Sequence, residues 1–315
     1  MITSILFTLI ILASAALLVT AAFSPLETLS WWAGWTEDEL DIVGPAPLPS
    51  PEDNQPGPYV VYLSGIASIS GQYLIPREKA FIKGIRNRLP DATVITDVFP
   101  YAASGVHLIA PPRSFERLWR WLQKIKLQGR RSVLSVLIKI RNVYQVMISA
   151  DHRYGPIYNQ GAAQAIETAL LGAGYTPNSS APIIIIGYSG GAQIAVGAVT
   201  FLKARLSAPI DVISIGGVIA SDPGLNAIDR LHYVCGDGDN VRRFGAVMFP
   251  ERWSVMANSE WNTAKREGRI SFHKMADMLH AGPQGYFGLP KKDGVSNNQR
   301  TLERVVDILH ASDPS

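Results

Sequence analysis

The pattern of hydrophobic and polar positions divides the chain near residue 58. Beyond that point, short apolar runs rich in β-branched residues alternate with stretches of helical spacing. Continuous apolar runs, rather than alternating ones, are typical of strands covered on both faces. The predicted strands are 58–65, 92–99, 182–187, 210–215, 231–235 and 270–275, and the predicted helices are 78–89, 159–172, 192–206 and 301–310. Strands separated by helices predict an α/β fold with a doubly wound, mostly parallel sheet.

The amino-terminal segment differs from the rest because residues 2–23 are apolar on every face and carry no charged side chain. At 1.5 Å per residue this run spans about 30 Å, the thickness of the hydrocarbon layer of a bilayer. Its length and its lack of Lys and Arg favour an uncleaved transmembrane anchor over residues 1–25. A cleaved signal sequence, which would make the protein secreted, is the alternative. The side of the membrane that the domain faces stays open, because neither flank carries the Lys or Arg that sets orientation.

Residues 26–58 form an acidic, proline-rich segment. Seven acidic residues precede Arg77, the first basic residue, and six prolines lie between positions 45 and 58. Prolines without a periodic apolar face predict a stiff, extended linker. The folded domain is therefore expected over residues 59–315. The segment also contains three tryptophans, Trp31, Trp32 and Trp35. Their indole rings fit either a position at the membrane–water interface or packing onto that domain.

An insertion at 104–150 interrupts the alternation of strands and helices. Basic residues recur on one helical face and apolar residues on the other: Arg113, Arg117, Arg120 and Lys124 against Phe115, Leu118, Leu122 and Ile125. Such a basic amphipathic helix favours binding at a membrane surface, with an ordinary solvated face as the alternative. Insertions at the carboxyl ends of strands lie over the site, so we expect a helical, lid-like element here.

One short motif carries the chemistry, Gly-Tyr-Ser-Gly-Gly at residues 187–191. A run of four isoleucines precedes it and an alanine-rich helical stretch follows it. A serine on a sharp strand-to-helix turn needs small neighbours, and the turn exposes Ser189 Oγ above the sheet. The same turn aims the amide of Gly190 at a developing oxyanion. The alternative, a glycine-rich phosphate-binding loop, is disfavoured because the sequence forms neither the Gly-Lys-Ser/Thr pattern nor Gly-x-Gly-x-x-Gly here.

In this context the motif resembles the nucleophile elbow of the α/β-hydrolase family, and the resemblance covers residues 59 to about 310. It implies the chain order nucleophile, acid, histidine. The acid implied is Asp239 in the turn after the strand at 231–235, with Asp237 and then Asp222 as alternatives.

The resemblance also implies the base and the oxyanion hole. Of the histidines beyond the acid, His280 opens a loop after the last strand, whereas His273 lies within that strand and His310 in the closing helix. We therefore expect His280 to be the base. The second oxyanion donor is expected to be the amide of Ile66, with Gly65 as the alternative.

These features predict a serine hydrolase that cleaves carboxylic esters or thioesters, with an apolar acyl group, through an acyl-enzyme. The alternative is a non-catalytic member of the fold that binds a lipid or a protein at a membrane. The expected partners are a small ester or lipid and a membrane. The net charge of +3 is no signature of nucleic-acid binding. One cysteine excludes an intramolecular disulfide framework, and no spacing of acidic residues or histidines indicates a metal, so no cofactor is expected.

Overall fold

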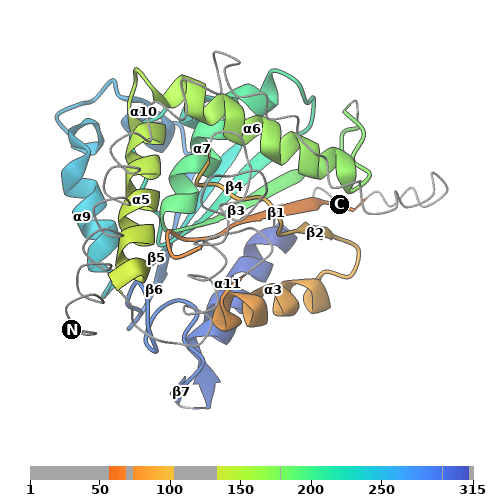
Figure 1. Ribbon diagram of the computed structural model, residues 1–315, viewed down its shortest axis with the longest axis vertical. Helices are drawn as coiled ribbons and strands as arrows, with labels where there is room; N and C mark the ends of the chain where they lie inside the picture. Colours follow the sequence, from red (N-terminus) through yellow and green to blue (C-terminus); the bar gives the residue numbers. More distant parts are fainter. Residues whose placement is uncertain (1–56, 69–73, 103–132, 178, 293, 312–315) are drawn as a thin grey trace, which may run out of the picture.

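The computed structural model describes residues 57–68, 74–102, 133–177, 179–292 and 294–311. Their centre is a six-stranded sheet in which every pairing is parallel (Figure 1). The strands lie in the order β2 (Thr93–Ile95), β1 (Tyr59–Leu63), β3 (Ile183–Tyr188), β4 (Ile210–Ile215), β5 (Arg230–Gly236) and β6 (Ile270–Met275). A separate antiparallel pair joins β7 (Lys291–Lys292) to β8 (Val295–Ser296).

Both faces of the sheet are covered, as the continuous apolar runs predicted. In β3, Ile183 and Ile185 belong to one hydrophobic core, and Ile184 and Ile186 belong to a second. Because successive side chains of a strand point to opposite faces, these are the cores on the two sides of the sheet. The prediction of a doubly wound α/β fold is confirmed.

The helices fall into two groups. One core contains residues of α3 (Pro76–Arg88) and α11 (Asn297–Ala311). The other contains residues of α5 (Val133–Ala150), α6 (Gly155–Gly172) and α7 (Gly190–Lys203). Shorter elements follow β4 and β5: α8 (Gly224–Ala227), α9 (Asn240–Met248), the 3₁₀ helix η1 (Pro250–Arg252) and α10 (Glu260–Arg266).

The observed boundaries differ from the predicted ones at helix starts and at one strand. Both α3 and α6 begin earlier than predicted, each with a proline in its first two positions, where its fixed φ suits a helix start. β2 is shorter than predicted and covers only Thr93–Ile95. The chain then leaves the sheet edge, and Phe99 and Tyr101 pack into the core instead.

The predicted insertion lies only partly in the described residues. Residues 133–150 form α5, a helix of the domain itself, with Ile138 and Val146 in the core that also contains α7. This part of the insertion is therefore a core helix rather than a lid. The basic stripe from Arg113 to Lys124 lies outside the described residues and stays a prediction.

In the part of the chain that the structure describes, no helix combines the length and apolarity needed to cross a bilayer. The predicted anchor over residues 1–25 and the linker up to residue 56 lie outside that part. Both stay predictions.

Candidate active site

Ser189 occupies a strained turn between β3 and α7. Its φ of 55° and ψ of −123° lie in a region that residues with a side chain rarely adopt. Such a conformation costs on the order of 1–3 kcal/mol and persists only where its surroundings enforce it. The neighbouring glycines allow other parts of the backbone to lie close to this turn. A Cβ at Gly187 would lie 2.5 Å from Ala192 Cα, and one at Gly191 would lie 2.7 Å from the carbonyl oxygen of Leu63.

The structure brings Ser189, His280 and Asp239 into one hydrogen-bonded chain. His280 Nε2 lies 2.8 Å from Ser189 Oγ, and His280 Nδ1 lies 3.0 Å from each carboxylate oxygen of Asp239. The three residues follow β3, β6 and β5, respectively. The carboxyl ends of parallel strands share one edge of a sheet, and this is why residues far apart in sequence meet there.

Asp239 is fully buried and receives several hydrogen bonds. Its Oδ1 accepts the amide of Arg242 at 2.9 Å, and its Oδ2 accepts the hydroxyl of Tyr286 at 2.8 Å. Burial alone would raise the pKa of Asp239, but the bonds from His280, Arg242 and Tyr286 outweigh it and hold that pKa below its ordinary value. Asp239 is therefore ionised near neutral pH and faces the imidazole as an anion.

Tyr286 links the carboxylate to the end of β5, and the sequence reasoning missed it. Its hydroxyl donates to Asp239 and accepts the amide of Gly236 at 2.7 Å. Burial, with Asp239 beside it, raises the pKa of the Tyr286 phenol, so it remains a donor at every physiological pH. The only sequence signal was its place in the loop that begins at His280.

Tyr188, the second residue of the motif, holds the imidazole from another side. Its ring stacks on that of His280, with centroids 5.6 Å apart and planes inclined by 20°. Its hydroxyl donates to the carbonyl oxygen of His280 at 2.8 Å. These contacts fix both the backbone and the ring of His280. The sequence reasoning assigned Tyr188 no role.

The alternative acids and histidines lie elsewhere. Asp237 is exposed, two residues before Asp239. Asp222 accepts hydrogen bonds from Gln193 and Gly224 rather than from His280. His273 faces His232 across β6 and β5, with ring nitrogens 3.3 Å apart. His310 lies in the last turn of α11.

The loop after β1 lies against the serine turn. A Cβ at Gly190 would lie 3.0 Å from Ile66 Cγ2, and one at Gly65 would lie 3.5 Å from Ser189 Cβ. Gly190 and Ile66, the two expected oxyanion donors, are thus neighbours. The direction of their amides stays a prediction.

A buried polar residue of α5 holds this loop in place. Asn142, fully buried, donates to the carbonyl oxygens of Ile66 and Ser68, each at 2.8 Å. The hydroxyl of Tyr101 donates to the carbonyl oxygen of Ser64 at 2.7 Å. α5 therefore contributes to the candidate site through a residue that helical spacing alone did not single out.

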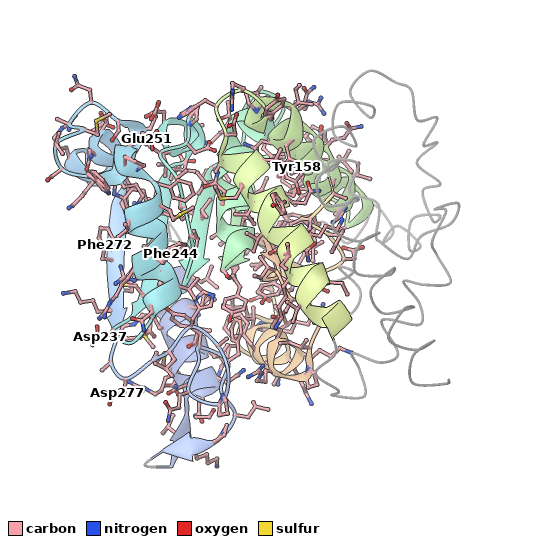
Figure 2. All side chains as sticks on the ribbon, turned by 60° about the vertical axis from the view of Figure 1, so that its left-hand side comes forward. Tyr158, Asp237, Phe244, Glu251, Phe272 and Asp277 are labelled. Carbon is pink, nitrogen blue, oxygen red and sulfur yellow. The ribbon has the colours of Figure 1, made fainter. Side chains whose placement is uncertain are left out.

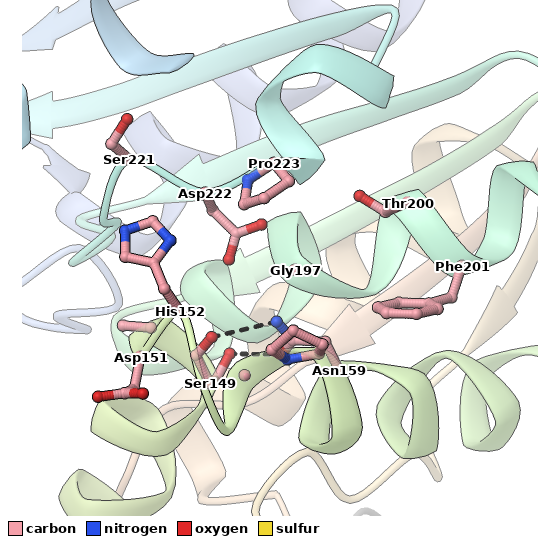
Figure 3. A pocket seen from close by; sticks show the side chains of 13 residues that line it. Ser149, Asp151, His152, Asn159, Gly197, Thr200, Phe201, Ser221, Asp222 and Pro223 are labelled. Atoms are coloured by element: carbon pink, nitrogen blue, oxygen red, sulfur yellow. Dashed lines mark hydrogen bonds between the residues drawn. The ribbon is translucent and has the colours of Figure 1, made fainter. Parts of the chain in front are cut away.

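A small pocket of about 180 Å³ lies beside α7, away from the serine turn (Figure 3). Gly197, which lines it, follows Ser189 by eight residues, or about 12 Å along the helix. The wall carries Asp222, and burial raises the pKa of this carboxyl group to about 6. His152 and Asp151 also lie here, and a hydrogen bond from Arg153 lowers the pKa of Asp151 to about 2.

Within the described residues, no group of three His, Cys, Asp or Glu side chains is arranged to hold a metal ion.

Comparison with known proteins gives remote structural likenesses only. No protein-family model and no curated protein matches the sequence. Among solved structures, the chain is similar to P91, a dienelactone hydrolase-like promiscuous phosphotriesterase from metagenomic libraries, at 12% identity and a TM-score of 0.44, over 81% of this chain and 86% of that one. It is also similar to a hyperthermophilic esterase from Pyrobaculum calidifontis, at 12% identity and a TM-score of 0.43, over 83% and 77% of the two chains. At such values the likeness says nothing about chemistry, which has to come from the geometry of the site.

Proposed function

We propose that this protein is a serine hydrolase that cleaves carboxylic esters or thioesters, with an apolar acyl group. The hydrogen-bonded chain from Ser189 through His280 to Asp239 carries this proposal. It supplies a nucleophile, a base within reach of the hydroxyl proton, and a carboxylate that orients the base. The strained conformation of Ser189 adds support, because strain of this kind clusters at active sites.

In the proposed acylation, Ser189 Oγ attacks the carbonyl carbon while His280 Nε2 takes the hydroxyl proton. Asp239 holds the tautomer with the proton on Nδ1 and stabilises the imidazolium that forms. The low pKa of Asp239 suits this role, since the carboxylate stays charged while the imidazole becomes a cation. The imidazolium then protonates the leaving alcohol or thiol.

The negative charge that develops on the carbonyl oxygen needs donors that are already in position. We assign this role to the amides of Gly190 and Ile66. Gly190 opens α7, where backbone amides lack partners within the helix and the helix dipole favours an anion. Ile66 lies in the loop after β1, and the hydrogen bonds from Asn142 and Tyr101 hold that loop in place. A preorganised donor of this kind is worth roughly 2.7–4 kcal/mol in the transition state.

Deacylation uses the same residues in the reverse direction. A water molecule gives its proton to His280 as it attacks the acyl-enzyme, and the acid product leaves as Ser189 regains its proton. Transfer of the acyl group to another alcohol would use identical steps. The proposed chemistry requires no cofactor, because these side chains and amides supply every group it uses.

We further propose that the hydrolase works at a membrane. The apolar run at residues 2–23 would tether the domain through the proline-rich linker. Substrates with apolar acyl groups, lipids among them, concentrate at that surface, which is the reason for the acyl preference proposed above.

A fluorophosphonate probe tests the catalytic role directly. The full chain should become labelled on Ser189, and Ser189→Ala should abolish the label, whereas Ser254→Ala, at an exposed serine, should keep it. Mass spectrometry of the labelled peptide identifies the site. A folded wild-type chain that takes up no label would instead be a non-catalytic binding module.

A further inference from the structure

α9 turns its apolar side away from the domain. Val241, Phe244, Val247 and Met248 are between 42% and 65% exposed. At 100° per residue these side chains share one side of the helix, about 120° wide. Gly245, about 100° around the helix from the centre of this stripe, faces the domain, where a Cβ would lie 2.7 Å from Val218 Cγ1. Surface helices ordinarily bury their apolar stripe, so the orientation of α9 needs a reason.

The exposed apolar surface continues beyond η1. Trp253, Val255 and Met256 are 48%, 77% and 46% exposed. The indole of Trp253 donates to the carbonyl oxygen of Ala246 at 3.2 Å, which places it against α9. We call these seven side chains the α9 surface: Val241, Phe244, Val247, Met248, Trp253, Val255 and Met256. Figure 2 shows α9, with Phe244, on the outside of the molecule. Exposed apolar side chains gathered in this way mark an interaction site.

The α9 surface begins at the candidate active site. Asp239 is the N-cap of α9, and its side chain accepts the amide of Arg242. α9 therefore starts at the sheet edge where Ser189 and His280 also lie. A partner covering the α9 surface would therefore lie close to that edge of the sheet.

The charge around this surface points to the class of partner. Arg243 is exposed on the flank of the apolar stripe. The segment that carries this surface, residues 240–256, has three arginines and one glutamate, a net charge of +2. Apolar side chains that include an indole, on a basic segment, suit a bilayer with anionic headgroups. The uncharged apolar run at residues 2–23 of the same chain is independent support.

We infer that the α9 surface docks on an anionic phospholipid bilayer, with Phe244, Val247 and Trp253 among the acyl chains. The apolar amino-terminal run would hold the chain at the membrane, and the α9 surface would set the orientation of the domain there. Docking itself does not depend on hydrolysis. Only its benefit, direct access of Ser189 to esters in the bilayer, rests on the proposed function.

Spin labels on the full chain, reconstituted in vesicles of phosphatidylcholine and phosphatidylglycerol, test the inference. One label goes on Val247→Cys and a control label on Leu289→Cys, an exposed apolar position outside the α9 surface. The native Cys235 is buried, and burial raises the pKa of its thiol, so the introduced cysteine is the reactive one. Accessibility to dissolved oxygen and to a water-soluble nickel chelate is then measured at each position.

We expect the label at position 247 to be at least about tenfold less accessible to the nickel chelate than the label at 289, while remaining open to oxygen. Equal access of the nickel chelate to both labels would show that the α9 surface faces water, and would overturn the inference. Protection of position 247 from both reagents would also overturn it, in favour of a protein contact with a second copy or another segment of this chain. Hydrolysis of a soluble ester by the wild-type chain is measured separately, so failure of the proposed function is distinguished from failure of docking.

Discussion

Asp239 and Asp222 are two buried carboxyl groups beyond the ends of neighbouring strands, β5 and β4, and their environments differ in kind. Asp239 receives bonds from an imidazole, a phenol and an amide, and these hold its pKa below the ordinary value despite complete burial. Asp222 receives bonds from the side chain of Gln193 and the amide of Gly224, and burial prevails, raising its pKa to about 6.

The difference shows what makes a buried carboxylate useful to a histidine. Burial disfavours the charged form at both positions, and hydrogen bonds from donors favour it. The carboxylate of Asp239 is hydrogen-bonded to a group that can become a cation, the ring of His280, whereas the hydrogen-bond donors to Asp222 are the neutral amides of Gln193 and Gly224. From the sequence alone, either residue could be the acid. The hydrogen bonds around each carboxylate distinguish them, because Asp239 contacts His280 and Asp222 contacts Gln193 and Gly224.

The largest expected effect is that of Asp239→Asn on ester hydrolysis. The amide cannot stabilise the imidazolium and favours the wrong tautomer, so kcat should fall on the order of 10³-fold or more. Asp222→Asn and Asp237→Asn serve as matched controls, and each should leave kcat within about threefold of wild type, as for changes outside the catalytic unit. Steady-state kinetics on a short, soluble ester measures all three. A mild effect of Asp239→Asn combined with a severe effect of Asp222→Asn would reverse the assignment of the acid.

The second prediction concerns the free energy of unfolding as a function of pH. The two carboxyl groups change it in opposite directions as the pH rises. The pKa of Asp222 rises from 3.8 to about 6 on folding. Its contribution to stability is therefore complete below pH 3.8 and is lost as the pH rises through 6, a change of about 3 kcal/mol. The pKa of Asp239 is lowered, so its contribution is present above pH 3.8 and is lost as the pH falls through its folded value.

Urea unfolding of the wild type and of Asp222→Asn at pH 4 and pH 7.5 measures this difference. Between the two pH values the variant should escape a loss of about 2.5 kcal/mol that the wild type suffers, because pH 4 already lies slightly above the unfolded pKa. The comparison uses each protein's own change with pH, so any constant cost of the amide facing Gln193 cancels. An identical change in both proteins would mean that Asp222 does not titrate in this range.

The fold was predictable from the sequence because its signals are local. Four isoleucines in succession indicate a strand buried on both faces, and Ser189 was identifiable because its turn needs glycines on both sides. The sequence reasoning did not find α9, because apolar side chains that face outward break the rule by which buried helix faces are recognised. Tyr286 and Asn142 were also missed. Asn142 holds Ile66, 76 residues away, and no local pattern encodes such a contact.

The smallest expected effect in this comparison is that of Tyr286→Phe. The variant keeps the packing of the ring and loses only the hydroxyl that donates to Asp239 and accepts from Gly236. The carboxylate loses one of the bonds that fix its orientation, and the amide of Gly236 loses its acceptor. We expect kcat to fall about tenfold with KM nearly unchanged, because Tyr286 acts on the transition state only through Asp239 and His280.

A general loss of stability is separated from this effect by Tyr158→Phe, which removes another buried hydroxyl, bonded to the carbonyl oxygen of Pro100 at 2.6 Å. Both variants should lose about 1–2 kcal/mol in the free energy of unfolding, the cost of a buried hydrogen bond and an unsatisfied partner. Only Tyr286→Phe should lower kcat. If the two variants lose activity equally, Tyr286 contributes to the fold and not to the alignment of Asp239. If kcat falls for Tyr286→Phe alone, the environment of the carboxylate, rather than its presence beyond a strand, determines which of the two buried acids serves His280.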